Sequence, residues 1–161
     1  YRRQRQMCIR DSGDPDPLYD DCSNNSSAGT NQVTAMHSKN IGDQLNDKDV
    51  TWGWFQGGFR PTEEATDDAR ARCGASHTTL TGQNQTDYNP HHQPFQYYAS
   101  TANPHHLAPS SDDMIGKTDR ANHQYDLQDF DTALEQGNLP AVSFLKAANY
   151  QDGHALSLIH I

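Results

Sequence analysis

The chain lacks the features that mark several large classes of protein. No apolar run approaches the roughly 18 residues that a membrane-spanning helix needs. Only 33% of the 161 residues are hydrophobic, and the mean hydropathy is -0.97. Basic residues are also scarce, because 12 Lys and Arg stand against 21 Asp and Glu, for a net charge of -9. An acidic chain repels the phosphate backbone, so we expect neither a transmembrane segment nor a nucleic-acid partner.

Several common catalytic motifs are also missing. The chain has no His-Glu-x-x-His zinc motif, no Gly-rich phosphate loop that ends in Lys-Ser or Lys-Thr, and no Gly-x-Ser-x-Gly elbow. Gly57-Gly58 is not followed by Lys and indicates a turn. The carboxylate pairs Asp67-Asp68 and Asp112-Asp113 have no apolar neighbours, which is typical of solvated turns. No single motif therefore names a reaction.

Both ends of the chain match translations of a sequencing adapter. Residues 156–161 match the mosaic-end adapter of transposase-made libraries, and residues 2–12 match its opposite strand. We therefore expect residues 1–12 and 156–161 to be adapter-derived, and residues 13–155 to be an internal part of a longer domain. Eight basic and twenty acidic residues remain between 13 and 155, so the native part is still more acidic.

Two cysteines remain once Cys8 is assigned to the adapter. Cys22 and Cys73 are too far apart in sequence for a compact zinc motif, which needs ligand pairs a few residues apart. The pair could form a disulfide in an oxidising compartment, or the two could be separate thiols. The sequence leaves both open.

The first half of the chain predicts a loop, a helix and a strand. Residues 13–32 are rich in Asp, Asn, Ser and Pro, which predicts a surface loop. Ser38 is a candidate cap for a short helix with Ile41 and Leu45 on one face. Alternating apolar residues predict a strand over residues 50–55.

The second half predicts a long excursion and then another helix and strand. Residues 60–90 carry only a weak helical pattern, over 63–72. Leu127, Phe130 and Leu134 share one helix face, Gly137 marks the stop, and residues 139–145 predict a buried strand. Two helix–strand units favour an α/β fold with a mostly parallel sheet. Ligands then collect beyond the carboxyl ends of the strands, near residues 56–59 and 147–155.

Histidine is the residue that offers chemistry. Residues 13–155 contain His37, His77, His91, His92, His105, His106, His123 and His154. Two adjacent pairs, His91-His92 and His105-His106, follow prolines that stiffen the backbone. In an extended segment the two rings of a pair point to opposite sides. Trp52 and Trp54 either line a site or belong to the core.

Five blocks in order give the chain a likeness to a known family. They are Gly13 to Pro17, Asn40 to Asn46, Trp52 to Phe59, His91 to Phe95, and Asn138 to Lys146 continued by Asp152-Gly153-His154. Together they resemble the bacterial phosphoesterase family, which holds acid phosphatases and phosphatidylcholine-type phospholipases C with an alkaline-phosphatase-like α/β fold.

The resemblance implies hydrolysis of a phosphate ester, either a phosphomonoester or a phospholipid headgroup, through a covalent phospho-enzyme. It places His91, His92 and His154 around the phosphoryl group. It also implies that the Ser or Thr nucleophile and a Glu-Asn metal pair precede Gly13, and that an Asp metal pair follows Ala155. The divalent metal ion is then expected to bind fully only in the full-length parent. Export to the periplasm or beyond is a further implication.

A second hypothesis is a noncatalytic, histidine-rich protein that binds metal ions or another macromolecule. Eight histidines and an acidic surface are its basis. Tight divalent binding that depends on His105 and His106, rather than on His91 and His154, would favour this hypothesis.

Overall fold

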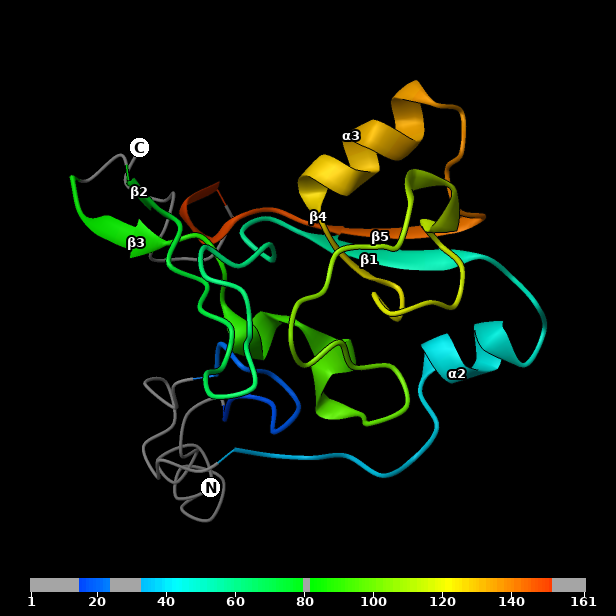
Figure 1. The fold of residues 1–161 in the computed structure, drawn as a ribbon, viewed down its shortest axis with the longest axis horizontal. Coiled ribbons are helices and arrows are strands. Elements are labelled where there is room, and N and C mark those ends of the chain that lie inside the picture. The colour runs from blue at the N-terminus through cyan, green and yellow to red at the C-terminus, as the bar shows by residue number, and fades with distance from the viewer. Residues whose placement is uncertain (1–14, 24–32, 80–81, 152–161) are drawn as a thin grey trace, which may run out of the picture.

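The fold is built on a small parallel β-sheet with helices on both faces (Figure 1). The computed structural model describes residues 15–23, 33–79 and 82–151. The strands of the sheet are β1 (Trp52–Gln56), β4 (Gln124–Asp126) and β5 (Val142–Lys146). Their order is β4-β1-β5, and both outer strands run parallel to β1. The predicted α/β fold with a parallel sheet is confirmed.

The other elements surround this sheet. A two-stranded antiparallel hairpin is formed by β2 (Ser76–Thr78) and β3 (Asn84–Thr86). The helices are α2 (Ile41–Asn46), α3 (Leu127–Glu135) and the 3₁₀ turns η1 (Pro90–His92), η2 (Pro94–Tyr97), η3 (Asp112–Met114) and η4 (Asn149–Gln151). At nine residues, α3 is the longest helix of the described ranges, and none of their helices could cross a bilayer.

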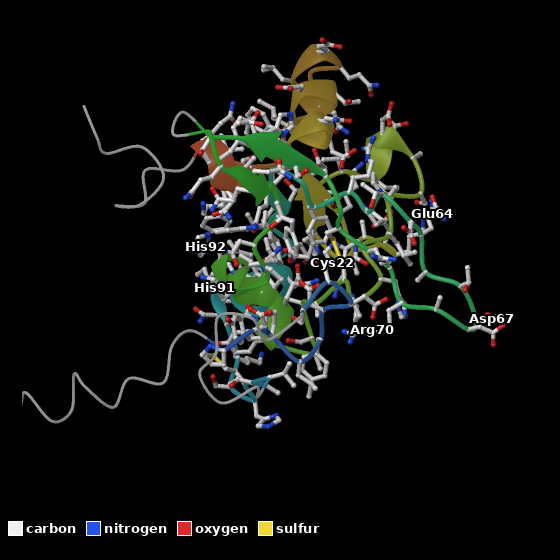
Figure 2. The ribbon with its side chains drawn as sticks, turned by 90° about the vertical axis from the view of Figure 1, so that its left-hand side faces the viewer. Cys22, Glu64, Asp67, Arg70, His91 and His92 are labelled. Atoms are coloured by element: carbon white, nitrogen blue, oxygen red, sulfur yellow. A yellow bond between two sulfur atoms is a disulfide. The ribbon has the colours of Figure 1, made fainter. Side chains whose placement is uncertain are left out.

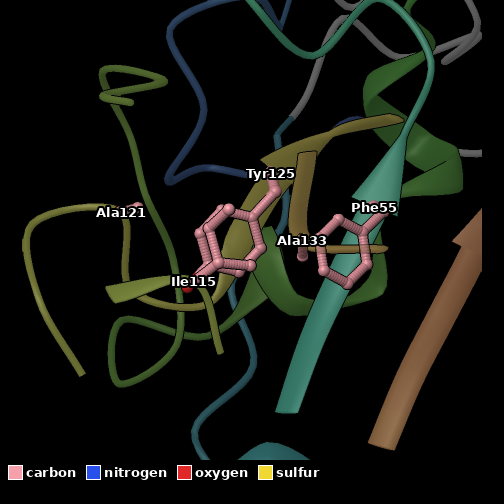
Figure 3. Close-up of a cluster of buried hydrophobic side chains, with 5 residues drawn as sticks. All are labelled: Phe55, Ile115, Ala121, Tyr125 and Ala133. Carbon is pink, nitrogen blue, oxygen red and sulfur yellow. The ribbon is translucent and has the colours of Figure 1, made fainter. Parts of the chain in front are cut away.

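Alternation along β1 divides the core between the two faces of the sheet. Phe55 points toward α3 and stacks on Tyr125, with ring centroids 5.1 Å apart. Ile115, Ala121 and Ala133 complete this cluster (Figure 3). On the opposite face, Trp52 packs against Phe95 of η2 at 4.7 Å. Trp52 is fully buried, so it belongs to the core.

Three details of the predicted helices and strands are wrong. Asn40 rather than Ser38 caps α2, because its side chain accepts hydrogen bonds from the amides of Gly42 and Asp43. Leu134 is 55% exposed, since Ala133 is the residue that α3 turns into the core. Residues 63–72 contain no helix; antiparallel bridges fold them into a narrow loop.

Strand β5 is less buried than its apolar sequence predicts. It pairs with β1 along one side only within the described sheet, and its residues are mostly half-buried. Leu145 is 55% exposed. Strand β4 is also an edge strand and is fully buried, so the exposure of β5 comes from incomplete cover of its faces by the described residues and not from its place in the strand order.

The segment of residues 15–23 is not the surface loop that its composition predicts. Asp16 and Asp20 are each only 1% exposed. A disulfide joins Cys22 to Cys73, which decides between the two alternatives left by the sequence. Buried carboxylates need hydrogen-bond partners. The carboxylates of Asp16 and Asp20 therefore make contacts inside the fold and do not face solvent.

Asp20 is the centre of a buried hydrogen-bond network. Its carboxylate accepts from the amide of Cys22 and from His106 Nε2, each at 2.8 Å. Tyr88 and Gln96 donate to its other oxygen. The second ring nitrogen of His106 lies 2.7 Å from the carbonyl oxygen of Phe59. Both ring nitrogens of His106 therefore lie within hydrogen-bond distance of an oxygen inside the fold.

Tyr88 remains a hydrogen-bond donor in this network. Burial raises the pKa of its phenol well above the usual value, and the charge of Asp20 raises it further. Phe59 stacks on the His106 ring with centroids 4.1 Å apart. The network therefore fixes segments from four distant parts of the sequence to one carboxylate.

Replacing Phe55 with Ala should lower the free energy of unfolding by about 3–5 kcal/mol, because it leaves a cavity beside Tyr125 and Ala133. Leu134→Ala is the matched control in the same layer. Its exposed side chain should cost only about 0.5 kcal/mol. Urea unfolding followed by circular dichroism measures both; equal losses would contradict the assignment of the core.

Replacing Asp20 with Asn should destabilise the fold by about 3–5 kcal/mol, because the buried groups of Tyr88, Gln96 and His106 lose a charged acceptor. Asp47→Asn removes an exposed carboxylate that pairs with Lys39, and it should leave the free energy of unfolding nearly unchanged. Chemical unfolding at pH 7 compares the two variants. An Asp20→Asn protein as stable as the Asp47→Asn protein would show that the network is dispensable.

Candidate functional site

The carboxyl ends of β1 and β5 meet at one edge of the sheet. The amide of Gly57, directly after β1, donates to the carbonyl oxygen of Lys146 at 3.1 Å. Gly57 also lies against Ala148, where any Cβ would clash with the backbone. The two segments expected at the ligand edge, 56–59 and 147–155, therefore lie together as far as Gln151. Asp152 and His154 lie outside the described residues.

The histidine pair of η1 is attached to the same edge. Gln56, the last residue of β1, donates through its Nε2 to the carbonyl oxygen of Asn89 at 3.1 Å. Its side-chain oxygen in turn accepts from Trp54 Nε1 at 2.9 Å. Asn89 precedes η1, so these bonds hold the start of η1 at the end of β1. Figure 2 looks at this side of the molecule and shows His91 and His92 beside each other.

The two rings contact each other instead of pointing to opposite sides. Pro90 begins a 3₁₀ turn, which brings consecutive side chains closer than an extended segment does. The ring centroids of His91 and His92 are 4.5 Å apart, at an angle of 77°. The prediction of opposite directions is therefore wrong for this pair, and both imidazoles belong to one surface.

Asp16 is the carboxylate behind His91. Its Oδ1 lies 3.6 Å from His91 Nδ1, and the side chains are 2% and 13% exposed. That ring nitrogen is buried and makes no hydrogen bond. The other nitrogen, Nε2, lies 3.3 Å from the side-chain amide of Asn89. The carboxylate of Asp16 therefore lies against the buried side of the His91 ring.

Sequence reasoning missed Asp16 as a site residue. Asp16 stands in one of the five blocks that carried the family resemblance, and that position was the available signal. The contact between Asp16 and His91 could not be predicted, because 75 residues separate them in the sequence. The Tyr97 hydroxyl helps close this gap by donating to the carbonyl oxygen of Pro15 at 2.7 Å.

The second histidine pair is divided between two environments. His106 is fully buried on Asp20, while His105 is exposed and pairs with Asp21 at 2.8 Å. The two imidazoles therefore do not converge on a common ligand. This arrangement gives no support to a metal site made from His105 and His106.

The described residues do not fit a divalent metal ion. Among them, three metal-binding side chains converge at one place, and these are Cys22, Cys73 and His106. The two cysteines form a disulfide and have no thiolate to offer. No step through a metal ion is therefore derived from these residues.

The long excursion after β1 is remote from the histidine pair. Glu64 and Asp67 lie on a loop at the opposite side of the molecule from His91 and His92 (Figure 2). Arg70 bonds to Asp21 and to the carbonyl oxygen of Asp20. The carboxylates Asp67 and Asp68 are exposed, as a solvated turn predicts.

A comparison with protein-family models gives a match over residues 8–160, to the model described as the Phosphoesterase family. A search of curated proteins found no match. The family match covers nearly the whole chain, including the β1 edge, η1 and the Asp16 segment. Hydrolysis of phosphoric esters is the chemistry of this family, and an edge that carries paired imidazoles suits it. The chain belongs to the Phosphoesterase family.

Proposed function

We propose that this chain is part of a phosphoric ester hydrolase of the acid phosphatase or phospholipase C type. Its substrate is a phosphomonoester or a phospholipid headgroup. One observation carries the proposal: His91 and His92 contact each other at the carboxyl end of β1, with the buried carboxylate of Asp16 behind them. Ligands bind at this edge in open α/β sheets.

The paired imidazoles suit a phosphoryl group. Protonated imidazoles donate charge-assisted hydrogen bonds to phosphoryl oxygens, and these bonds are about twice as strong as neutral ones. A second imidazole in contact also offers a proton to the leaving alcohol. We assign His91 and His92 to the phosphoryl side of the site, with His154 as the third imidazole.

We further propose that this chain supplies only part of the catalytic site. The resemblance assigns the Ser or Thr nucleophile and the divalent metal ligands to the full-length parent, outside residues 13–155. The contribution of this chain is then to bind and orient the phosphoryl group.

An oxidising compartment suits the protein. The Cys22–Cys73 disulfide closes a loop with a sequence separation of 51 residues, which stabilises a fold by about 4 kcal/mol in the chain-entropy model. Such bonds persist in the periplasm or outside the cell. We propose a periplasmic or secreted location on this basis and on the resemblance.

Replacing His91 or His92 with Asn in the full-length parent should lower kcat/KM for p-nitrophenyl phosphate by about 10²–10³-fold, because the phosphoryl group loses a charge-assisted donor. His37→Asn is the control, since His37 is exposed and precedes α2. It should change kcat/KM less than about twofold. Assays on phosphatidylcholine would separate the phospholipase from the phosphatase. A parent that hydrolyses neither ester would overturn the proposal, and active His91 and His92 variants would overturn the assignment.

The 161-residue chain alone should not hydrolyse p-nitrophenyl phosphate, whereas the full-length parent should. The physical reason is that a phospho-enzyme cannot form without a nucleophile beside the imidazoles. A colorimetric assay at mildly acidic pH with added divalent metal ions compares the two proteins. Robust turnover by the chain alone would contradict the division of the site.

A further inference from the structure

A third imidazole is fixed at the same edge of the sheet. His77 of β2 places its Nδ1 2.7 and 2.9 Å from the two oxygens of Asp87. One face of its ring stacks on Tyr150 of η4, with centroids 4.3 Å apart. The side chain of Asp87 is only 7% exposed, whereas that of His77 is 55% exposed. The ring is therefore immobilised while its outer edge remains open to solvent.

Asp87 is attached to the carboxyl ends of both β1 and β5. Gly58, two residues after β1, has a φ of +77° and lies against Asp87 so closely that a Cβ could not fit. The carbonyl oxygen of Asp87 accepts a hydrogen bond from the amide of Asn149, which follows β5, at 2.8 Å. Figure 1 shows the β2–β3 hairpin beside the turn that follows β5. His77 thus stands at the ligand edge.

The hydrogen bond to Asp87 decides which ring nitrogen of His77 meets a ligand. A carboxylate on Nδ1 keeps a proton there and leaves Nε2 as the outward atom. Nε2 makes no hydrogen bond to any residue in the described ranges. When protonated, the ring presents one N–H whose direction is already fixed. Little side-chain entropy is then lost on binding.

We propose that His77 is a further binding residue for the phosphate group of the ligand, at the same strand ends as the η1 pair. Asp87 precedes His91 by four residues, so one short segment carries the partner of His77 and the first histidine of the pair. The inference rests on the proposed function for the identity of the ligand, a phosphate ester or inorganic phosphate. Neither the family resemblance nor the histidine pairs pointed to His77.

His105 provides a matched control. Its Nδ1 also bonds to a carboxylate, that of Asp21, at 2.8 Å, and its side chain is 57% exposed. Asp21 is 10% exposed, close to the value for Asp87. Asp21 instead contacts Arg70 and the amide of Ala71 beside the disulfide. The two histidines have the same pairing and exposure and differ in position.

The test is a titration of the 161-residue chain with inorganic phosphate at fixed pH, followed by the imidazole signals in nuclear magnetic resonance spectra. The His77 signals should move along a saturating curve, and the His105 signals should not. His77→Asn keeps a donor near the Nδ1 position but removes Nε2. It should raise the phosphate Kd seen at His91 and His92 about tenfold, whereas His105→Asn should leave it unchanged. Immobile His77 signals, or equal effects of the two variants, would overturn the inference.

The full-length parent separates binding from structural support. His77→Asn should raise KM for p-nitrophenyl phosphate about tenfold with kcat within about twofold, and His77→Gln should restore part of the loss because its amide reaches the Nε2 position. A merely structural role predicts the reverse order, with Asn better than Gln. An inactive wild-type parent would overturn the proposed function, and the phosphate titration would still decide the role of His77.

Discussion

The buried carboxylate of Asp20 is the interaction on which the rest of the structure depends. The chain buries little apolar surface, so polar contacts fix its long loops. A buried polar group that loses its hydrogen-bond partner destabilises the fold, so each of these contacts matters individually. Asp20 gathers donors from Cys22, Tyr88 and His106, and His106 continues the network to Phe59. The disulfide to Cys73 closes the same region. One charge thus organises the loops that the apolar core cannot reach.

This organisation is what brings the ligand edge together. Tyr88 donates to Asp20 and is followed directly by Asn89, which bonds to the end of β1. Asp16 lies four residues before Asp20 and faces His91. The carboxylate network and the histidine pair are therefore built from the same two segments. Loss of the Asp20 network would therefore displace the histidine pair, although the network stabilises the fold and the pair belongs to the proposed binding site.

The sequence predicts two of the three strands of the parallel sheet, β1 and β5, because periodicity is a local signal, and it misses the short strand β4. The apolar runs around Trp52 and after Leu139 identify β1 and β5, and the spacing of Leu127 and Phe130 identifies α3. What it misses is set by contacts between distant residues. The burial of Asp16, Asp20 and Asp87 depends on partners that lie ten to 86 residues away. Composition alone assigns such carboxylates to solvent, because most carboxylates are solvated. The family resemblance indicated a role for His91 but did not indicate Asp16 as its partner.

Position, rather than chemical pairing, distinguishes the histidines of this protein. His77, His91, His105 and His106 each face an aspartate, so the pairing by itself carries no functional information. His106 is enclosed and serves the fold, and His105 stands beside the disulfide, away from the strand ends. His77 and His91 stand where parallel strands end, beside Gly57 and Gly58, which pack closely against Ala148 and Asp87. An acidic chain that binds an anion needs its hydrogen-bond donors placed at one local surface, and imidazoles held by buried carboxylates at the strand ends meet that need.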